Sequence, residues 1–191
     1  MDEATKTLTF DANAYLAWEE QQVEKHEYID GEVFTMGDVR RVHVMAAGNV
    51  SVALKRRLRG RPCEAFISQL KVHVREDNAF FYPDVVVSCH PEDLRAELAL
   101  EHPVIIVEVL SPTTEGYDRG TKFGHYRKLA SLQEYVLVDV DARRVEVFRR
   151  TADQGWLLHD YHDEHSVWSV QSLGLSISLA EIFEGIQQPS P

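Results

Sequence analysis

The chain has 191 residues, of which 44% are hydrophobic, so we expect one ordinary domain with a substantial core rather than a disordered chain. Its 20 Lys and Arg against 31 Asp and Glu give a formal net charge of −11, which argues against a protein that coats nucleic acid nonspecifically. No segment has the pattern of a signal peptide or a membrane-spanning helix, so we expect a cytoplasmic protein with no membrane partner.

Helices and strands alternate in the predicted secondary structure. Apolar residues recur at helical spacing in several segments, and short β-branched and aromatic runs between turn residues indicate strands. Asp30-Gly31 between two such runs is typical of a β-hairpin, and Asn78 marks a turn within a predicted β-meander. The predicted helices cover 11–24, 40–58, 118–130 and 179–183, and the predicted strands lie within 27–36, 62–89, 103–110, 134–150 and 155–177.

This order of elements predicts a single α/β (α+β) domain. Strands interleave with helices, and the central strands are apolar on both faces, which is typical of a mixed β-sheet flanked by helices. Hairpins near both ends of the chain would extend that core. We expect the domain to span 9–185, between a flexible N-terminus over 1–8 and a flexible tail over 186–191.

Neither the cysteines nor a run of histidines indicates a zinc site. Cys63 and Cys89 form no CxxC pair and lie among apolar residues, so we expect two reduced, buried thiols rather than a disulfide framework. His159, His162 and His165 stand three residues apart, but in a strand and turn such positions point to opposite faces. We therefore expect a solvated hairpin loop there.

Two carboxylates stand beside buried strands. Asp84 precedes the apolar run 85–87, and Glu108 lies near the end of the apolar run that begins at Pro103. An ionised Glu in such a run is unfavourable unless it is paired. If the two strands are neighbours, the carboxylates converge at one rim of the sheet and favour a cation between them. Mg²⁺ or Mn²⁺ suits hard oxygen ligands and can activate water for attack on a phosphodiester.

Lys122 lies in the next predicted helix, on the face that should point inward. From there its ammonium can orient the attacking water or stabilise negative charge. Structural roles are also open to these residues: Asp84 can cap a turn, Glu108 can accept hydrogen bonds from the backbone of 111–114, and Lys122 can pair with Asp118. The buried setting of Glu108 favours a functional role for the three together.

The end of the second predicted helix carries the densest positive charge in this acidic chain. Lys55, Arg56 and Arg59 lie there, where they either complement the helix dipole or contact phosphate. Together with Arg119 they are the candidate nucleic-acid-binding residues.

Four motifs of the chain resemble a known family. They are YIDGE at 28–32, YPDVVV at 82–87, VIIVEVLSPTTEGYDRGTKFGHY at 104–126 and EYVLVDVDARRVEVF at 134–148. In this order, and over most of the chain, they resemble the Uma-type family of restriction-endonuclease-like proteins in the PD-(D/E)xK phosphodiesterase superfamily. The resemblance implies a restriction-endonuclease-like core and a homodimer, since superfamily members that cut both strands often pair.

The same resemblance implies roles for individual residues. Asp84 and Glu108 would be metal ligands, with the backbone carbonyl of Val109 as another. The superfamily pattern has Lys two residues after the second acid, where this chain has Leu110, so Lys122 would take over that role.

Two further catalytic candidates, Glu32 and His43, are expected in the same cleft. The first follows the hairpin turn, and the second lies near the start of a helix on which the superfamily carries an extra acidic or polar residue.

Three functional hypotheses remain open at this point. The first is a Mg²⁺- or Mn²⁺-dependent endonuclease that cleaves DNA. The second is a nuclease fold that no longer cuts and serves as a binding or assembly module, which the net charge and Leu110 favour. The third is a metal phosphoesterase of small nucleotides, which an acidic surface tolerates more easily than a long duplex.

Overall fold

The computed structural model describes residues 11–37, 39–67, 70–163 and 165–187, and the expected flexible N-terminus lies outside these residues. None of the described helices is long and apolar enough to span a membrane. The described strands are β1 His26–Ile29, β2 Glu32–Thr35, β3 Glu64–Ile67, β4 Lys71–Val74, β5 Ala79–Phe81, β6 Val85–Ser88, β7 Ala99–Leu100, β8 Pro103–Val109, β9 Glu134–Asp139, β10 Arg144–Arg150, β11 Trp156–Tyr161, β12 Val167–Val170 and β13 Leu175–Ser178. The helical segments are α1 Ala12–Glu19, α2 Arg41–Leu58, α3 Glu115–Tyr117, the π-helical η3 Asp118–Lys122, α4 Phe123–Tyr126, α5 Leu179–Ile182 and the 3₁₀ turns η1 Arg75–Asp77, η2 Asp93–Arg95 and η4 Gln171–Leu173.

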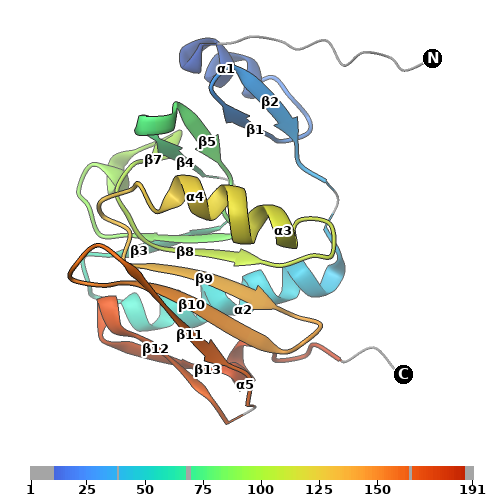
Figure 1. The fold of residues 1–191 in the computed structure, drawn as a ribbon, viewed down its shortest axis with the longest axis vertical. Helices are drawn as coiled ribbons and strands as arrows, with labels where there is room; N and C mark the ends of the chain where they lie inside the picture. Colours follow the sequence, from blue (N-terminus) through green and yellow to red (C-terminus); the bar gives the residue numbers. More distant parts are fainter. Residues whose placement is uncertain (1–10, 38, 68–69, 164, 188–191) are drawn as a thin grey trace.

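A six-stranded mixed sheet forms the centre of the molecule (Figure 1). Its strand order is β11-β10-β9-β8-β6-β3, with β8 and β9 parallel and all other neighbours antiparallel. Helix α2 covers one face, and the α3–α4 segment covers the other (Figure 1). The expected class, a mixed sheet flanked by helices, is confirmed.

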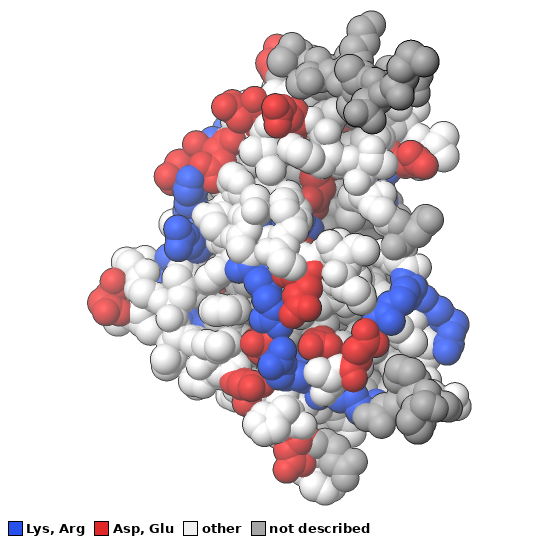
Figure 2. Space-filling view, turned by 45° about the vertical axis from the view of Figure 1, so that its right-hand side comes forward, with Lys and Arg blue, Asp and Glu red and all other residues white. Residues whose placement is uncertain are grey.

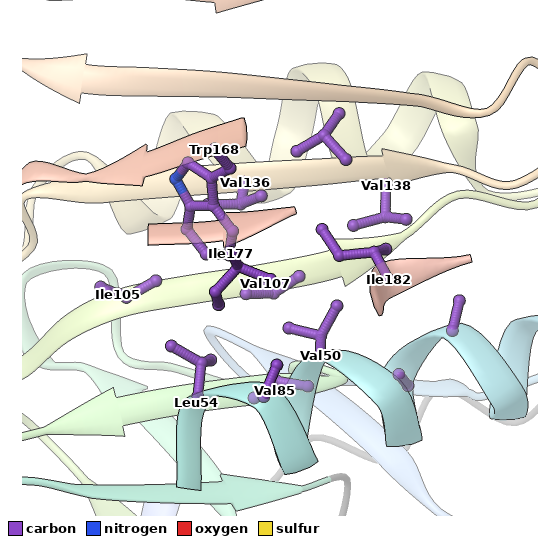
Figure 3. Close-up of a cluster of buried hydrophobic side chains, with 14 of the residues drawn as sticks. Val50, Leu54, Val85, Ile105, Val107, Val136, Val138, Trp168, Ile177 and Ile182 are labelled. Atoms are coloured by element: carbon purple, nitrogen blue, oxygen red, sulfur yellow. The ribbon is translucent and has the colours of Figure 1, made fainter. Parts of the chain in front are cut away.

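Strand β8 shows why one sheet can hold two cores. Because side chains alternate along a strand, Ile105 and Val107 face α2. In Figure 3 they lie in the same cluster as Val50 and Leu54 of that helix. Ile106 packs in the opposite core, beneath α4. Alternation puts Glu108 on that opposite side, facing the helix that carries Lys122.

The predicted β-meander over 62–89 is wrong. Strands β3 and β6 do pair, in the central sheet, but β4 and β5 leave it and form a hairpin in a second sheet of order β2-β1-β5-β4-β7. The hairpin turn at Asn78 is as expected, with φ of 47°. Alternation of apolar and polar residues specifies which face of a strand is buried, but not which strand it pairs with. The sequence therefore could not show that β4 and β5 belong to a different sheet.

Two predicted helices are shorter than expected. Helix α1 is capped by Asp11, which accepts a hydrogen bond from the Ala14 amide at 2.8 Å, but the helix ends at Glu19 rather than residue 24. The helical segment after β8 begins earlier, at Glu115, and ends at Tyr126 instead of residue 130. Arg150 donates hydrogen bonds to the carbonyl oxygens of Arg127 and Leu129. These backbone carbonyls have no partner within the helix, because the helix has already ended.

Cys63 and Cys89 form a disulfide, so the expectation of two reduced thiols is wrong. Cys63 precedes β3 and Cys89 follows β6, and the register pairs the next residues inward, Glu64 with Ser88. That pairing brings the two Cα atoms to 4.0 Å. Disulfides are rare in cytosolic proteins, so this bond does not support the cytoplasmic location expected from the sequence.

The C-terminal hairpin of β12 and β13 packs on the α2 side of the sheet through Trp168 and Ile177 (Figure 3). Ile186 is also buried in this core, and its carbonyl accepts a hydrogen bond from Arg143 at 3.2 Å. The tail expected from residue 186 therefore begins no earlier than Gln187, and residues 188–191 lie outside the described part of the chain.

Candidate active site

A pocket of about 310 Å³ opens at the rim of the central sheet where β8 ends. It is bounded by the β1–β2 hairpin and the segment that follows it, by the start of α2 and by the loop and helix after β8. The acidic, basic and imidazole side chains that line it are those of Glu27, His43, Asp84, Glu108, Asp118 and Lys122.

The register of two neighbouring strands sets Asp84 against Glu108. Strand β6 pairs antiparallel with β8, with Val85 opposite Val107. One further step in this register places Asp84 opposite Glu108, at the same rim. The adjacency on which the sequence argument depended is present, and it brings both carboxylates to the pocket.

Glu108 is 3% exposed, and its Oε1 has two partners. The Lys122 ammonium nitrogen lies 3.2 Å from Oε1, and the Tyr126 hydroxyl donates to it at 3.1 Å. Asp118 Oδ1 lies 3.7 Å from the same nitrogen. The π-helical turn over Asp118–Lys122 carries both of these residues, and such turns are frequently found at functional sites.

Glu27, which the sequence analysis did not select, is the nearest partner of Lys122. Its Oε1 lies 2.8 Å from the ammonium nitrogen and accepts a hydrogen bond from the Tyr82 amide at 3.2 Å. Glu27 is 4% exposed on β1, in the second sheet. Glu32 lies at the other side of the same hairpin, is exposed and does not line the pocket. No local signal separated the two glutamates, because both belong to the same hairpin and only its packing buries Glu27.

Asp84 is held from two directions. His43 Nε2 lies 2.8 Å from Oδ1, and the Val109 amide donates to Oδ2 at 2.7 Å. The other ring nitrogen of His43 is buried and has no hydrogen-bond partner among the described residues. The start of α2 therefore orients Asp84 through one imidazole nitrogen.

Leu110 occupies the position at which a PD-(D/E)xK pattern has lysine. It is buried in the core beneath α4, with Tyr126 and Leu137. The ammonium group beside Glu108 comes instead from Lys122, 5% exposed, on the helical segment after β8.

Burial dominates the electrostatics of this cluster. It raises the pKa of Glu108 well above the usual value, with the Lys122 charge opposing the shift. It also raises the pKa of Asp118. Burial alone would lower the pKa of Lys122, but the carboxylates of Glu108, Glu27 and Asp118 outweigh it and raise that pKa well above normal. Lys122 therefore keeps its proton to a higher pH than an exposed lysine, and Glu108 takes up a proton at a higher pH than an exposed carboxyl.

The oxygen donors fit a hard divalent ion. Asp84 and Glu108 face each other, and Val109 also lines the pocket, which makes its carbonyl a candidate third oxygen. Lys122 and Tyr126 both use Oε1 of Glu108, so Oε2 accepts no hydrogen bond from the described residues. Carboxylate and carbonyl oxygens are the ligands that Mg²⁺ and Mn²⁺ prefer.

The candidate nucleic-acid-binding residues lie outside the pocket. Lys55, Arg56 and Arg59 are exposed at or just after the C-terminal end of α2, and Lys55 is about 18 Å along the helix from His43 at 1.5 Å per residue. Arg119 pairs with Glu115 at 2.8 Å and with Glu146. Figure 2 shows acidic and basic side chains interspersed on one face, with no large basic area.

Comparisons with known proteins show the family and the fold of this chain. Residues 12–180 match the family model Uma2, described as "Putative restriction endonuclease". Two uncharacterized proteins of Synechocystis sp., slr1290 and sll1609, are each 36% identical, over 90% and 85% of this chain and 90% and 92% of their own lengths. The crystal structure of "a putative nuclease belonging to DUF820" from Anabaena variabilis superposes with a TM-score of 0.75 at 18% identity, covering 91% of this chain and 97% of the other. That likeness shows a shared fold.

Proposed function

We propose, since this chain belongs to the Uma2 family ("Putative restriction endonuclease"), that it hydrolyses DNA phosphodiester bonds in a reaction that needs Mg²⁺ or Mn²⁺. One observation carries the proposal: Asp84, Glu108 and Lys122 line a single pocket, although the lysine does not follow Glu108 in the strand. The pocket thus holds two acids and an ammonium group, the residue types that PD-(D/E)xK chemistry requires.

Asp84 and Glu108 would hold the ion, with the Val109 carbonyl as a further ligand. The bound ion would polarise a phosphoryl oxygen and lower the pKa of a water molecule. His43 would keep the Asp84 carboxylate turned toward the pocket through its 2.8 Å contact. The Val109 amide, at 2.7 Å from Oδ2, would do so from the strand side.

Lys122 would supply positive charge beside the reacting phosphate. Its raised pKa keeps it protonated, so it would orient the attacking water and stabilise developing negative charge rather than accept a proton. Glu27 and Asp118 restrain the ammonium at 2.8 and 3.7 Å. A charged group held this way needs little rearrangement when a substrate binds.

An alternative is a nuclease fold that does not cut and acts as a binding or assembly module. Four carboxylates and one lysine line the pocket, and the basic end of α2 is remote from the pocket. Little positive charge is therefore placed to attract the phosphates of a DNA backbone. The same acidic lining suits a small nucleotide better than a duplex. A homodimer is proposed by analogy with enzymes that cut both strands, and light scattering tests it.

Nicking of supercoiled plasmid DNA with Mg²⁺ or Mn²⁺ tests the proposal. We expect the wild-type protein to nick the plasmid and Asp84→Asn to lose the activity while keeping its fold by circular dichroism. Equal nicking by both proteins would show a contaminant or another site. Mn²⁺ binding without cleavage of DNA or of a mononucleotide phosphodiester would favour the binding module.

A further inference from the structure

We propose that His90, Glu92 and His102 form a second metal site, for Zn²⁺ or a similar transition-metal ion, at the end of β6 and β8 remote from the pocket. One ligand atom from each of the three residues lies within 4.8 Å of the others. Two imidazoles and a carboxylate are a donor set that suits Zn²⁺ and disfavours Mg²⁺.

The sheet itself fixes the two histidines. His90 follows β6 and His102 precedes β8, and these strands pair at Ser88 and Pro103. The Ser88 hydroxyl donates to the His102 carbonyl and accepts from the His90 amide, each at 3.1 Å. The two imidazole rings stack with centroids 4.0 Å apart and planes 21° apart. The two rings are thus already neighbours, and rotation about their side-chain bonds would turn one nitrogen of each toward a common ion.

A buried carboxylate orients one of these rings. Asp93 is 3% exposed and accepts the amides of Glu101 and His102 at 3.0 and 2.9 Å. Its Oδ1 also lies 3.3 Å from Nδ1 of His102. We assign the Nδ1 proton to this contact, which leaves the lone pair of Nε2 for a metal. A carboxylate behind a ligating histidine is the usual support of a zinc site.

The site is open to solvent and separate from the pocket. The His102 side chain is 37% exposed and Glu92 is exposed, so an ion can enter and water can complete its coordination. Glu108 lies six positions after His102 along β8, about 20 Å at the rise of an extended strand. The same two strands therefore carry Asp84 and Glu108 at one end and the histidine site at the other.

The test is calorimetric titration with Zn²⁺ on the full chain, in an Asp84→Asn background that weakens metal binding in the pocket. Thiol titration first verifies that the Cys63–Cys89 disulfide is intact, so no thiolate contributes. We expect one Zn²⁺ per chain, with binding at least tenfold weaker in His90→Ala and in Glu92→Gln. His162→Ala, which removes an exposed histidine elsewhere, is the matched control and should bind as the background does.

His102 is not replaced in these variants, because it contacts the buried Asp93 and its loss can disturb the loop. A second measurement separates loss of the metal site from unfolding. Glu92 is exposed, so Glu92→Gln keeps the fold by circular dichroism. With Co²⁺ as the probe, the background protein should show d–d absorption that His90→Ala lacks. Equal Zn²⁺ affinity in His90→Ala, or no Zn²⁺ binding by the background protein, would overturn the site without bearing on the nuclease pocket.

Discussion

The Lys122 ammonium nitrogen lies 3.2 Å from Oε1 of Glu108, although the two residues belong to different secondary-structure elements. Glu108 is the penultimate residue of β8, and Lys122 ends a π-helical turn on the segment that folds back over that strand. This arrangement places a lysine next to the second acid without a lysine in the strand. It makes Lys122 the residue whose replacement distinguishes the proposals most sharply.

Replacing Lys122 with methionine should remove activity and weaken the fold. The substitution leaves the buried Glu27 and Glu108 without their cation, and breaking a buried pair in this way typically lowers the free energy of unfolding by about 3–5 kcal/mol. Loss of one charge-stabilising group should lower the cleavage rate about 10²- to 10³-fold. Urea denaturation and plasmid nicking measure the two effects. A Lys122→Met protein that unfolds at a lower urea concentration than the wild type but nicks plasmid at the wild-type rate would rule out a role for Lys122 in the reaction.

Glu108→Gln should behave differently, losing activity without losing stability. The ionised carboxylate is disfavoured by burial, as its raised pKa shows, and Lys122 keeps Glu27 and Asp118 as partners. We expect no detectable Mn²⁺-dependent nicking and a midpoint of urea unfolding at or above that of the wild type. A large loss of stability would indicate that Glu108 is mainly a structural partner of Lys122.

Two glutamates of one hairpin provide a matched pair. Glu27→Gln removes the nearest partner of Lys122 and should lower the cleavage rate, whereas Glu32→Gln changes an exposed residue outside the pocket and should leave it unchanged. Each variant removes one negative charge from the same β1–β2 hairpin, so a change in net charge cannot explain a difference between their cleavage rates. A stronger effect of Glu32→Gln would restore that residue as the catalytic candidate.

His43 should act as a positioning residue for Asp84. His43→Phe keeps an aromatic ring but loses the 2.8 Å contact to Oδ1, and loss of such a supporting contact typically weakens metal binding about 10- to 100-fold. Calorimetry with Mn²⁺ measures the change, and His43→Gln, whose amide can still donate, should recover part of it. Equal Mn²⁺ affinity in His43→Phe and wild type would contradict this role.

Metal binding in the pocket should weaken as the pH falls through the raised pKa of Glu108. The ion needs the deprotonated carboxylate, and burial makes the carboxyl retain its proton above the ordinary Glu pKa of about 4.3. The Mn²⁺ affinity should therefore decline at a pH at which an exposed carboxylate site is unaffected. Titrations from pH 8 to pH 5 in buffers of different ionisation enthalpy should also detect proton release. Affinity and heat that do not vary with pH would exclude a protonated Glu108 in the metal-free protein.

The local pattern of the chain was sufficient for much of this fold. Asp30-Gly31 specified the first hairpin, and the alternation in β8 put Glu108 on the face opposite α2. The apolar runs that became β6 and β8 were recognisable as buried strands beside Asp84 and Glu108, whereas their pairing was only a condition that the structure meets. Each of these inferences depends on short-range geometry, since turn chemistry and side-chain direction follow from a few consecutive residues.

The inferences that failed depended on pairing between distant segments. The disulfide exists because the β3–β6 register sets Cys63 against Cys89, and no local pattern encodes that register. Strands β4 and β5 joined the second sheet, and this sheet delivers Glu27 to Lys122. Glu27 and Glu32 have the same chemistry and lie in the same hairpin, so only the packing of that hairpin on the rest of the molecule could separate them.

The sequence by itself therefore determined the family, the fold class and the acids at the ends of two buried strands, because hydrophobic periodicity and motif order are properties of the chain. The tertiary structure decided which ammonium group stands beside Glu108, which glutamate restrains it and that His90 and His102 meet at the far end of the same strands. Those contacts join elements whose approach is set by strand pairing and helix packing, and burial then sets the charge state of the residues that meet there.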